Sequence, residues 1–168
     1  MPRRSFSARI VVALVLLPLA GSAQSALSIP PQGCVFRPGN NPAWAAPSFD
    51  ESTWLPASQF PERQNMNPYW WVRCRLVPFA LAPEIHPVLQ VTGDFSYELF
   101  VDGQRLGAFG NIQTGAHTVG VAGEYESPLF APGSQPILVA LRITETPTHF
   151  GEQLFPRLLL GDRQYLRG

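Results

Sequence analysis

Apolar and polar residues alternate along several short segments of the chain, which is the pattern of β-strands with one buried face. The clearest case is residues 69–77, a segment rich in aromatic and β-branched residues. One set of alternate residues is mostly apolar and is expected to face the core: Trp70, Val72, Cys74 and Leu76. The other set is expected on the outer face: Trp71, Arg73 and Arg75.

Six further segments have the length and composition of strands and are separated by turn signals. They are residues 87–92, 97–101, 104–108, 125–130, 136–144 and 156–160. Asp102 and Gly103 stand between two of these segments and predict a two-residue hairpin turn, because both central positions of such a turn need a positive φ. With a first strand near Cys34, about eight strands are expected. This spacing predicts an all-β fold, a sandwich or a barrel.

The segment between the first two strands, residues 38–60, has no period of either two or 3.6 residues. It carries Trp44, Phe49 and Trp54, which we expect to hold an irregular loop against the fold. Large aromatic side chains supply much of the apolar area that a small domain buries. We therefore expect Trp54 and Trp70 in the core.

The N-terminus has the pattern of a secretory signal peptide. Arginines precede the apolar run 10–17, and small residues lead to Ala23, after which we place the cleavage site. The apolar run is shorter than the ~20 residues that a membrane-spanning helix needs. Arg3 and Arg4 also fit a twin-arginine signal, so the general secretory route and the twin-arginine route both stay open. Either route predicts a periplasmic or extracellular location.

Cleavage would leave residues 24–168, which is the length of one domain. Residues 24–33 are small and polar and are expected to be a disordered tail, so the domain comprises residues 34–168. The 18 prolines and 14 glycines oppose long helices. The mature chain has nine arginines against twelve acidic residues, a net charge of −3. No basic stripe remains, so we expect no nucleic-acid partner.

Cys34 and Cys74 are the two cysteines of the chain. Disulfides persist in the oxidising compartments outside the cytoplasm, and two cysteines allow a single pairing. The sequence does not tell whether their Cα atoms come close enough for a bond. A disulfide and two separately buried thiols therefore both stay open.

No sequence motif for catalysis is present: there is no nucleophile elbow, no glycine-rich phosphate loop and no helical histidine pair. His86, His117 and His149 lie far apart, with no carboxylate at metal-ligand spacing. Glu124 and Glu126 could form a carboxylate pair, but alternate residues of any strand share a face. A solvated strand edge is the interpretation that we favour for them. We therefore expect no enzyme activity, no cofactor and no metal site.

Three segments together carry a resemblance: 49–54 (FDESTW), 69–73 (YWWVR) and 97–107 (YELFVDGQRLG). Their order resembles the galactose-binding-like jelly roll at the N-terminus of family 2 glycoside hydrolases. It resembles even more closely the extracytoplasmic sensor domain of bacterial multi-pass membrane receptors with phosphatase, kinase or cyclase outputs. The resemblance covers residues 36–160. One departure is Asp102, which stands where the hairpin usually has Asn.

The resemblance implies an antiparallel β-sandwich of the jelly-roll kind and a non-catalytic role. The main interpretation is a ligand-binding or sensory domain that forms the extracytoplasmic part of a signal-transduction protein. The alternative is an ancillary, sugar-binding-like domain of a glycoside hydrolase. The chain would be a fragment or a free-standing secreted form. The expected partners are a small molecule or a carbohydrate, and the remainder of a larger membrane receptor or enzyme.

Two polar, irregular segments, residues 110–123 and 146–155, are the expected place of a binding site, since the loops at one end of such a sandwich carry recognition. Our hypothesis is that they meet at one end, above an aromatic platform. The expected ligand-binding residues are Trp71, Asn111, His149 and Phe150.

Overall fold

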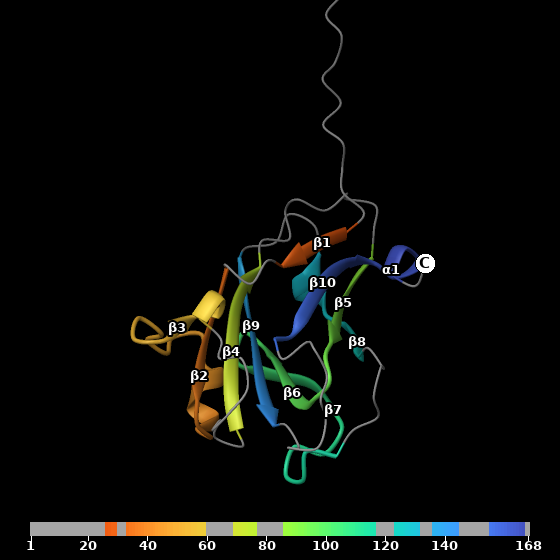
Figure 1. Ribbon diagram of the computed structural model, residues 1–168. Helices are drawn as coiled ribbons and strands as arrows, with labels where there is room; N and C mark the ends of the chain where they lie inside the picture. The colour runs from red at the N-terminus through yellow and green to blue at the C-terminus, as the bar shows by residue number, and fades with distance from the viewer. Residues whose placement is uncertain are drawn as a thin grey trace, which may run out of the picture.

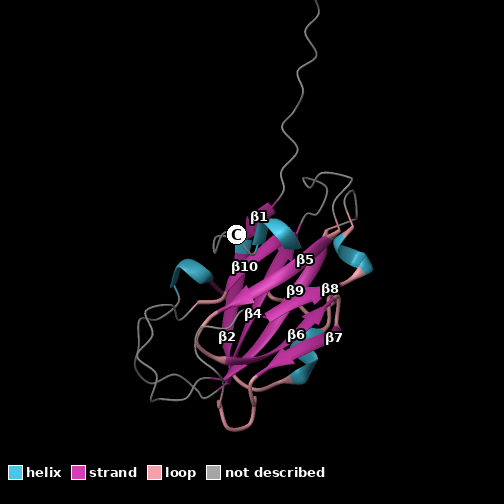
Figure 2. Cartoon of the chain, turned by 90° about the vertical axis from the view of Figure 1, so that its right-hand side faces the viewer, coloured by secondary structure: helices cyan, strands magenta, loops and turns pink. Residues whose placement is uncertain are grey.

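The computed structural model describes residues 26–29, 33–59, 69–76, 86–116, 123–131, 136–144 and 155–166. Within them the chain forms two antiparallel sheets packed face to face (Figures 1 and 2). The four-stranded sheet has the order β1 (Ala26–Ile29), β10 (Arg157–Asp162), β5 (Pro87–Thr92), β8 (Gly123–Glu126). The six-stranded sheet has the order β3 (Leu55–Pro56), β2 (Cys34–Pro38), β4 (Tyr69–Leu76), β9 (Ile137–Thr144), β6 (Ser96–Val101), β7 (Gln104–Phe109).

The fold class is the expected antiparallel β-sandwich, and the described residues form ten strands where about eight were predicted. The expectation of a disordered tail at residues 24–33 is wrong for Ala26–Ile29, which form β1 and pair with β10 along their whole length. Backbone pairing with a sheet edge stabilises this segment, and a local sequence pattern does not reveal such pairing.

A second difference concerns the predicted strand 125–130. The strand β8 ends at Glu126, and a 3-10 turn, η5 (Pro128–Phe130), follows. Proline removes a ladder donor, and the Ser127 side chain accepts a hydrogen bond from the Leu129 backbone N–H at 3.2 Å. The other short helical elements among the described residues are η2 (Pro42–Ala45), η3 (Ala57–Gln59) and α1 (Arg163–Leu166).

The main core fills the space between the two sheets. Strand β4 contributes the inward set that the alternation predicted, Trp70, Val72, Cys74 and Leu76, all at most 3% exposed. The four-stranded sheet contributes Leu89, Val91, Leu158 and Leu160. At one edge Tyr97 of β6 and Tyr125 of β8 join their hydroxyls at 3.0 Å, a polar contact between the sheets.

The predicted hairpin turn joins β6 and β7. Val101 pairs with Gln104, so Asp102 and Gly103 form the two-residue loop, with φ of 46° and 83°. The Asp102 carboxylate accepts a hydrogen bond from the Leu138 backbone N–H at 2.8 Å, which ties the turn to β9. The turn is therefore fixed both by its own backbone and by the next strand.

The outer face of β4 is covered, which the alternation did not predict. Segment 39–54 folds over it and forms a second, smaller core of Trp44, Ala45, Trp54, Trp71 and Ala140. Trp71 is 0% exposed, and its ring lies 6.5 Å from that of Trp44 and 5.5 Å from that of Phe100. The expected core positions of Trp54 and Trp70 are confirmed, at 6% and 1% exposed.

Arg73 holds this covering segment in place. Its guanidinium is fully buried and donates to the backbone carbonyls of Trp44, Ala46 and Phe49 and to the Glu51 carboxylate. Buried charge is costly unless it is paired and hydrogen-bonded, and here four acceptors from one loop satisfy it. Arg75, two residues further, binds Glu51 from the solvent side at 3.2 Å with its side chain 55% exposed.

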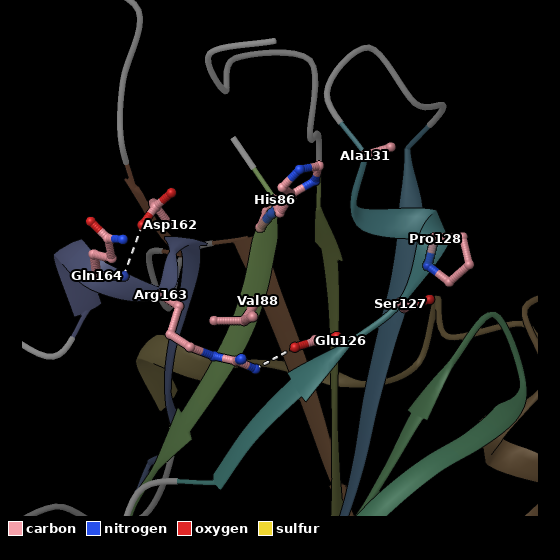
Figure 3. Close-up of a pocket in the computed structure, with 10 residues that line it drawn as sticks. His86, Val88, Glu126, Ser127, Pro128, Ala131, Asp162, Arg163 and Gln164 are labelled. Atoms are coloured by element: carbon pink, nitrogen blue, oxygen red, sulfur yellow. Dashed lines mark hydrogen bonds and ion pairs between the residues drawn. The ribbon is translucent and has the colours of Figure 1, made fainter. Parts of the chain in front are cut away.

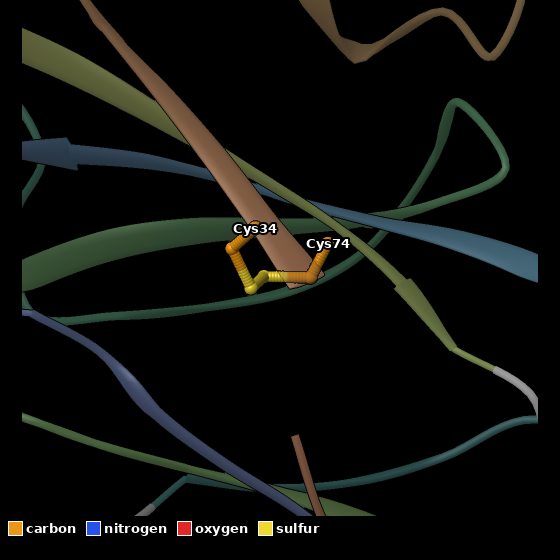
Figure 4. Close-up of a disulfide and its surroundings, with 2 residues drawn as sticks. All are labelled: Cys34 and Cys74. Carbon is orange, nitrogen blue, oxygen red and sulfur yellow. A yellow bond between two sulfur atoms is a disulfide. The ribbon is translucent and has the colours of Figure 1, made fainter. Parts of the chain in front are cut away.

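Cys34 and Cys74 form a disulfide between β2 and β4 (Figure 4). They are direct partners in the antiparallel register, with Cα atoms 4.2 Å apart, and both are buried on the inner face. Of the two alternatives that the sequence left open, the structure has the disulfide.

We predict that Gly103→Val destabilises the domain by about 1–2 kcal/mol, because a β-branched residue is strained at positive φ. An added Cβ at this position would also lie 3.0 Å from the Pro47 ring. Gly33→Val is the matched control, since no atom lies within 4 Å of its added Cβ. Urea unfolding measures both, and equal midpoints for the two variants would contradict the assignment of the turn.

We predict that Arg73→Met lowers the free energy of unfolding by about 3 kcal/mol or more, because it leaves three backbone carbonyls without their donor and removes the buried partner of Glu51. Arg75→Met, on the same strand and bound to the same carboxylate, should cost less than about 1 kcal/mol because its ion pair is solvent-exposed. Urea unfolding followed by tryptophan fluorescence compares them. A loss in Arg75→Met as large as in Arg73→Met would show that the charge, and not the buried hydrogen bonds, stabilises the loop.

We predict that the double variant Cys34→Ala/Cys74→Ala is less stable by about 3–4 kcal/mol, because the disulfide closes a loop with a sequence separation of 40. Urea unfolding of the oxidised protein and of the variant gives the difference. Thiol labelling of the unreduced, denatured wild-type protein is the control and should find no free thiol.

Candidate functional site

A pocket opens at one end of the four-stranded sheet, and the strand register explains its position. Val88 near the start of β5 pairs with Glu126 at the end of β8, and Pro87 pairs with Asp162 at the end of β10. Three strands therefore bring polar side chains to one end of the sheet. The pocket has a volume of about 800 Å³, which is within the range of small-molecule sites.

Figure 3 shows how the lining residues are arranged. Val88 forms part of the floor, and His86 lies above it at the start of β5. The wall on one side is Asp162 and Gln164, from β10 and α1, and the wall on the other side follows β8 and η5. The second wall consists of Ser127, Pro128 and Ala131.

Arg163 closes the lower edge of the pocket. Its Nη2 donates to the Glu126 carboxylate (Figure 3). Its Nε lies 3.4 Å from the Glu124 carboxylate. The two glutamates were expected at a solvated strand edge, and they do lie on the edge strand β8, where they share one arginine from α1. The positive charge of the Arg163 guanidinium is therefore already balanced by carboxylates of the protein.

The structure changes the expected ligand-binding set. Trp71 cannot be a platform for a ligand, because segment 39–54 covers it completely. Asn111 is exposed, and its carboxamide oxygen accepts hydrogen bonds from the backbone N–H groups of Gln113 and Thr114, at 2.9 and 3.3 Å. That oxygen therefore shapes its own loop. His149 and Phe150 lie outside the described residues.

The two expected loops do start from one end of the sandwich. Phe109, the last residue of β7, pairs with Tyr97, and Thr144, the last residue of β9, pairs with the neighbouring Ser96. The segment after β7 is held there by a hydrogen bond from the Ser96 hydroxyl to the Ala116 carbonyl, at 3.1 Å. A site shared by the two loops stays a prediction. The ends of β7 and β9 lie at the opposite end of the sandwich from α1 and the start of β5, which contribute to the pocket (Figure 1).

Candidate reactive groups within the described residues have structural partners. Burial raises the pKa of Tyr97 and of Tyr125, so both hydroxyls stay protonated, and they bond to each other between the sheets. Glu51 and Glu98 each form ion pairs with two arginines. No group of three or more metal-ligating side chains occurs in the part of the chain that is described. No helix there is long and apolar enough to span a membrane.

Sequence reasoning missed the pocket because its residues come from three separate segments, 86–88, 126–131 and 162–164. Each segment alone has the sequence of an ordinary strand end. The pairing of Glu124 and Glu126 on one face was visible, but their partner Arg163 follows them by almost 40 positions. Only the antiparallel register of β5 with β8 and β10 brings these groups together.

A comparison with protein-family models found no match, and neither did a comparison with curated proteins. Solved structures do match. A β-glucuronidase of Bacteroides uniformis superposes with a TM-score of 0.55 at 17% identity, over 80% of this chain and 17% of that protein. A family 2 glycosyl hydrolase of Bacteroides cellulosilyticus superposes with a TM-score of 0.52 at 13% identity, over 82% of this chain and 20% of that protein.

At these identities the likeness shows the fold alone. The chain has the β-sandwich fold of a domain-sized part of family 2 glycoside hydrolases, and it spans about a fifth of their length. This agrees with one of the two resemblances drawn from the sequence. The resemblance to sensor domains has no support among the structures named here.

Proposed function

We propose that the mature chain is a non-catalytic accessory module that acts outside the cytoplasm, of the ancillary kind found in family 2 glycoside hydrolases. One observation carries the proposal: about 80% of this chain corresponds to only 17% of a β-glucuronidase. The rest of such a protein is available for the catalytic domain. A module of this size contributes binding or packing to a larger assembly.

The chemistry of the described surface supports the same role. Glycoside hydrolysis needs two carboxyl groups that flank the bond, one of which acts as an acid. Here Glu51, Glu98, Glu124 and Glu126 each lie beside arginine guanidinium groups. These carboxylates are therefore engaged in ion pairs with side chains of the protein itself.

Location and partners belong to the same proposal. The predicted signal peptide and the buried disulfide both suit an oxidising compartment, so we propose a periplasmic or extracellular module. Its partners would be a small molecule or a carbohydrate, and the further domains of an enzyme. A sensory role, the main interpretation of the sequence, has no specific structural observation in its favour.

We predict that purified residues 24–168 release no more chromophore from aryl β-glucuronides and β-galactosides than a heat-denatured sample of the same preparation. The reason is the arginine pairing of the carboxylates described above. A spectrophotometric assay measures the release. Hydrolysis that is lost in Glu124→Gln or Glu126→Gln would make the chain an enzyme and overturn the proposal.

A further inference from the structure

We propose that the pocket between α1 and η5 binds a neutral sugar of one or two rings. This inference rests on the proposed accessory role, and it adds a site and a ligand class to it. The pocket lies away from the loops that the sequence had suggested, and three features of its lining define the ligand: size with apolar surface, charge, and hydrogen-bonding groups.

The size and the apolar surface suit a small ring. The volume of about 800 Å³ exceeds what a single side chain of a partner protein would fill. The apolar lining consists of Pro87, Val88, Pro128 and Ala131. Val88 is 2% exposed and closes the floor, whereas the exposed Pro128 and Ala131 offer carbon surface on one wall (Figure 3), against which the C–H face of a sugar ring can pack.

The charge disfavours an anion. Glu126 and Asp162 contribute two formal negative charges to the lining and Arg163 one formal positive charge, so the acidic and arginine side chains of the lining sum to −1. Arg163 is already shared with Glu124, outside the lining, so it offers little to a ligand carboxylate or phosphate. An anionic sugar would therefore meet net repulsion, whereas a neutral sugar would not.

The hydrogen-bonding groups suit hydroxyls, which donate and accept at the same atom. Asp162 accepts the Gln164 backbone N–H with Oδ1 at 2.8 Å, and a carboxylate has the capacity to accept further hydrogen bonds from ligand hydroxyls. The Ser127 oxygen accepts from the Leu129 N–H, so the hydroxyl proton is available to a ligand. The exposed Gln164 carboxamide adds a donor and an acceptor on the opposite wall.

The test uses residues 24–168 and four named probes: galactose, glucose, lactose and glucuronate. Calorimetric titration should find millimolar binding of at least one neutral sugar, and glucuronate should bind about tenfold more weakly. Gln164→Ala should weaken binding about fivefold by removing one polar contact. Ala131→Trp should abolish binding by filling the pocket, and Ala131 is exposed, so the fold should tolerate the change.

Gln113→Ala, in the exposed loop at the other end, is the matched control and should bind like the wild type. Amide chemical shifts should move at Val88 and Gln164 on titration. Binding that is lost in Gln113→Ala and kept in Ala131→Trp would place the site at the other end and overturn this inference. The inference would also be overturned if no neutral sugar bound, or if glucuronate bound as tightly as the neutral sugars. In that case the hydrolysis assay alone would test the accessory role.

Discussion

The buried guanidinium of Arg73 is the interaction on which the architecture of the six-stranded sheet depends. A strand in a sandwich normally buries one face and exposes the other, yet β4 is covered on both. Arg73 lies on the outer face and binds three carbonyls and one carboxylate of segment 39–54. Because the buried charge needs all these partners, the loop has one position, and it excludes water from Trp71.

This covering segment also connects distant parts of the fold. It packs on Ala140 of β9 and on Phe100 of β6, and its Pro47 leaves little room beside the hairpin turn, since a Cβ added at Gly103 would lie 3.0 Å from the proline ring. The disulfide joins β2 to β4 on the inner face, one register position from Arg73. The six-stranded sheet is therefore fixed from both sides. Its outer face in this region is occupied by the chain itself and presents no aromatic platform to a ligand.

The four-stranded sheet is built differently and offers more to a partner. Its outer face carries Val88, the shared ion pairs of Arg163 and the pocket between α1 and η5. The start of β5 and α1, which contribute to the pocket, lie at the opposite end of the sandwich from the loop after β7 (Figure 1). A recognition site at either end would leave the other end free for contact with further domains.

Local pattern and composition determined the fold class, seven strand segments, the Asp102-Gly103 turn and the inward set of β4, because alternation and turn chemistry act between neighbours in the chain. They did not determine β1, the cover over Trp71 or the pocket. Each of these depends on contacts between residues tens of positions apart: β1 with β10, Arg73 with the carbonyls of an earlier loop, Arg163 with Glu124 and Glu126. The register of the sheets decided these contacts. An unpaired strand edge or a buried charge binds whichever groups the fold brings close to it, wherever those groups stand in the sequence.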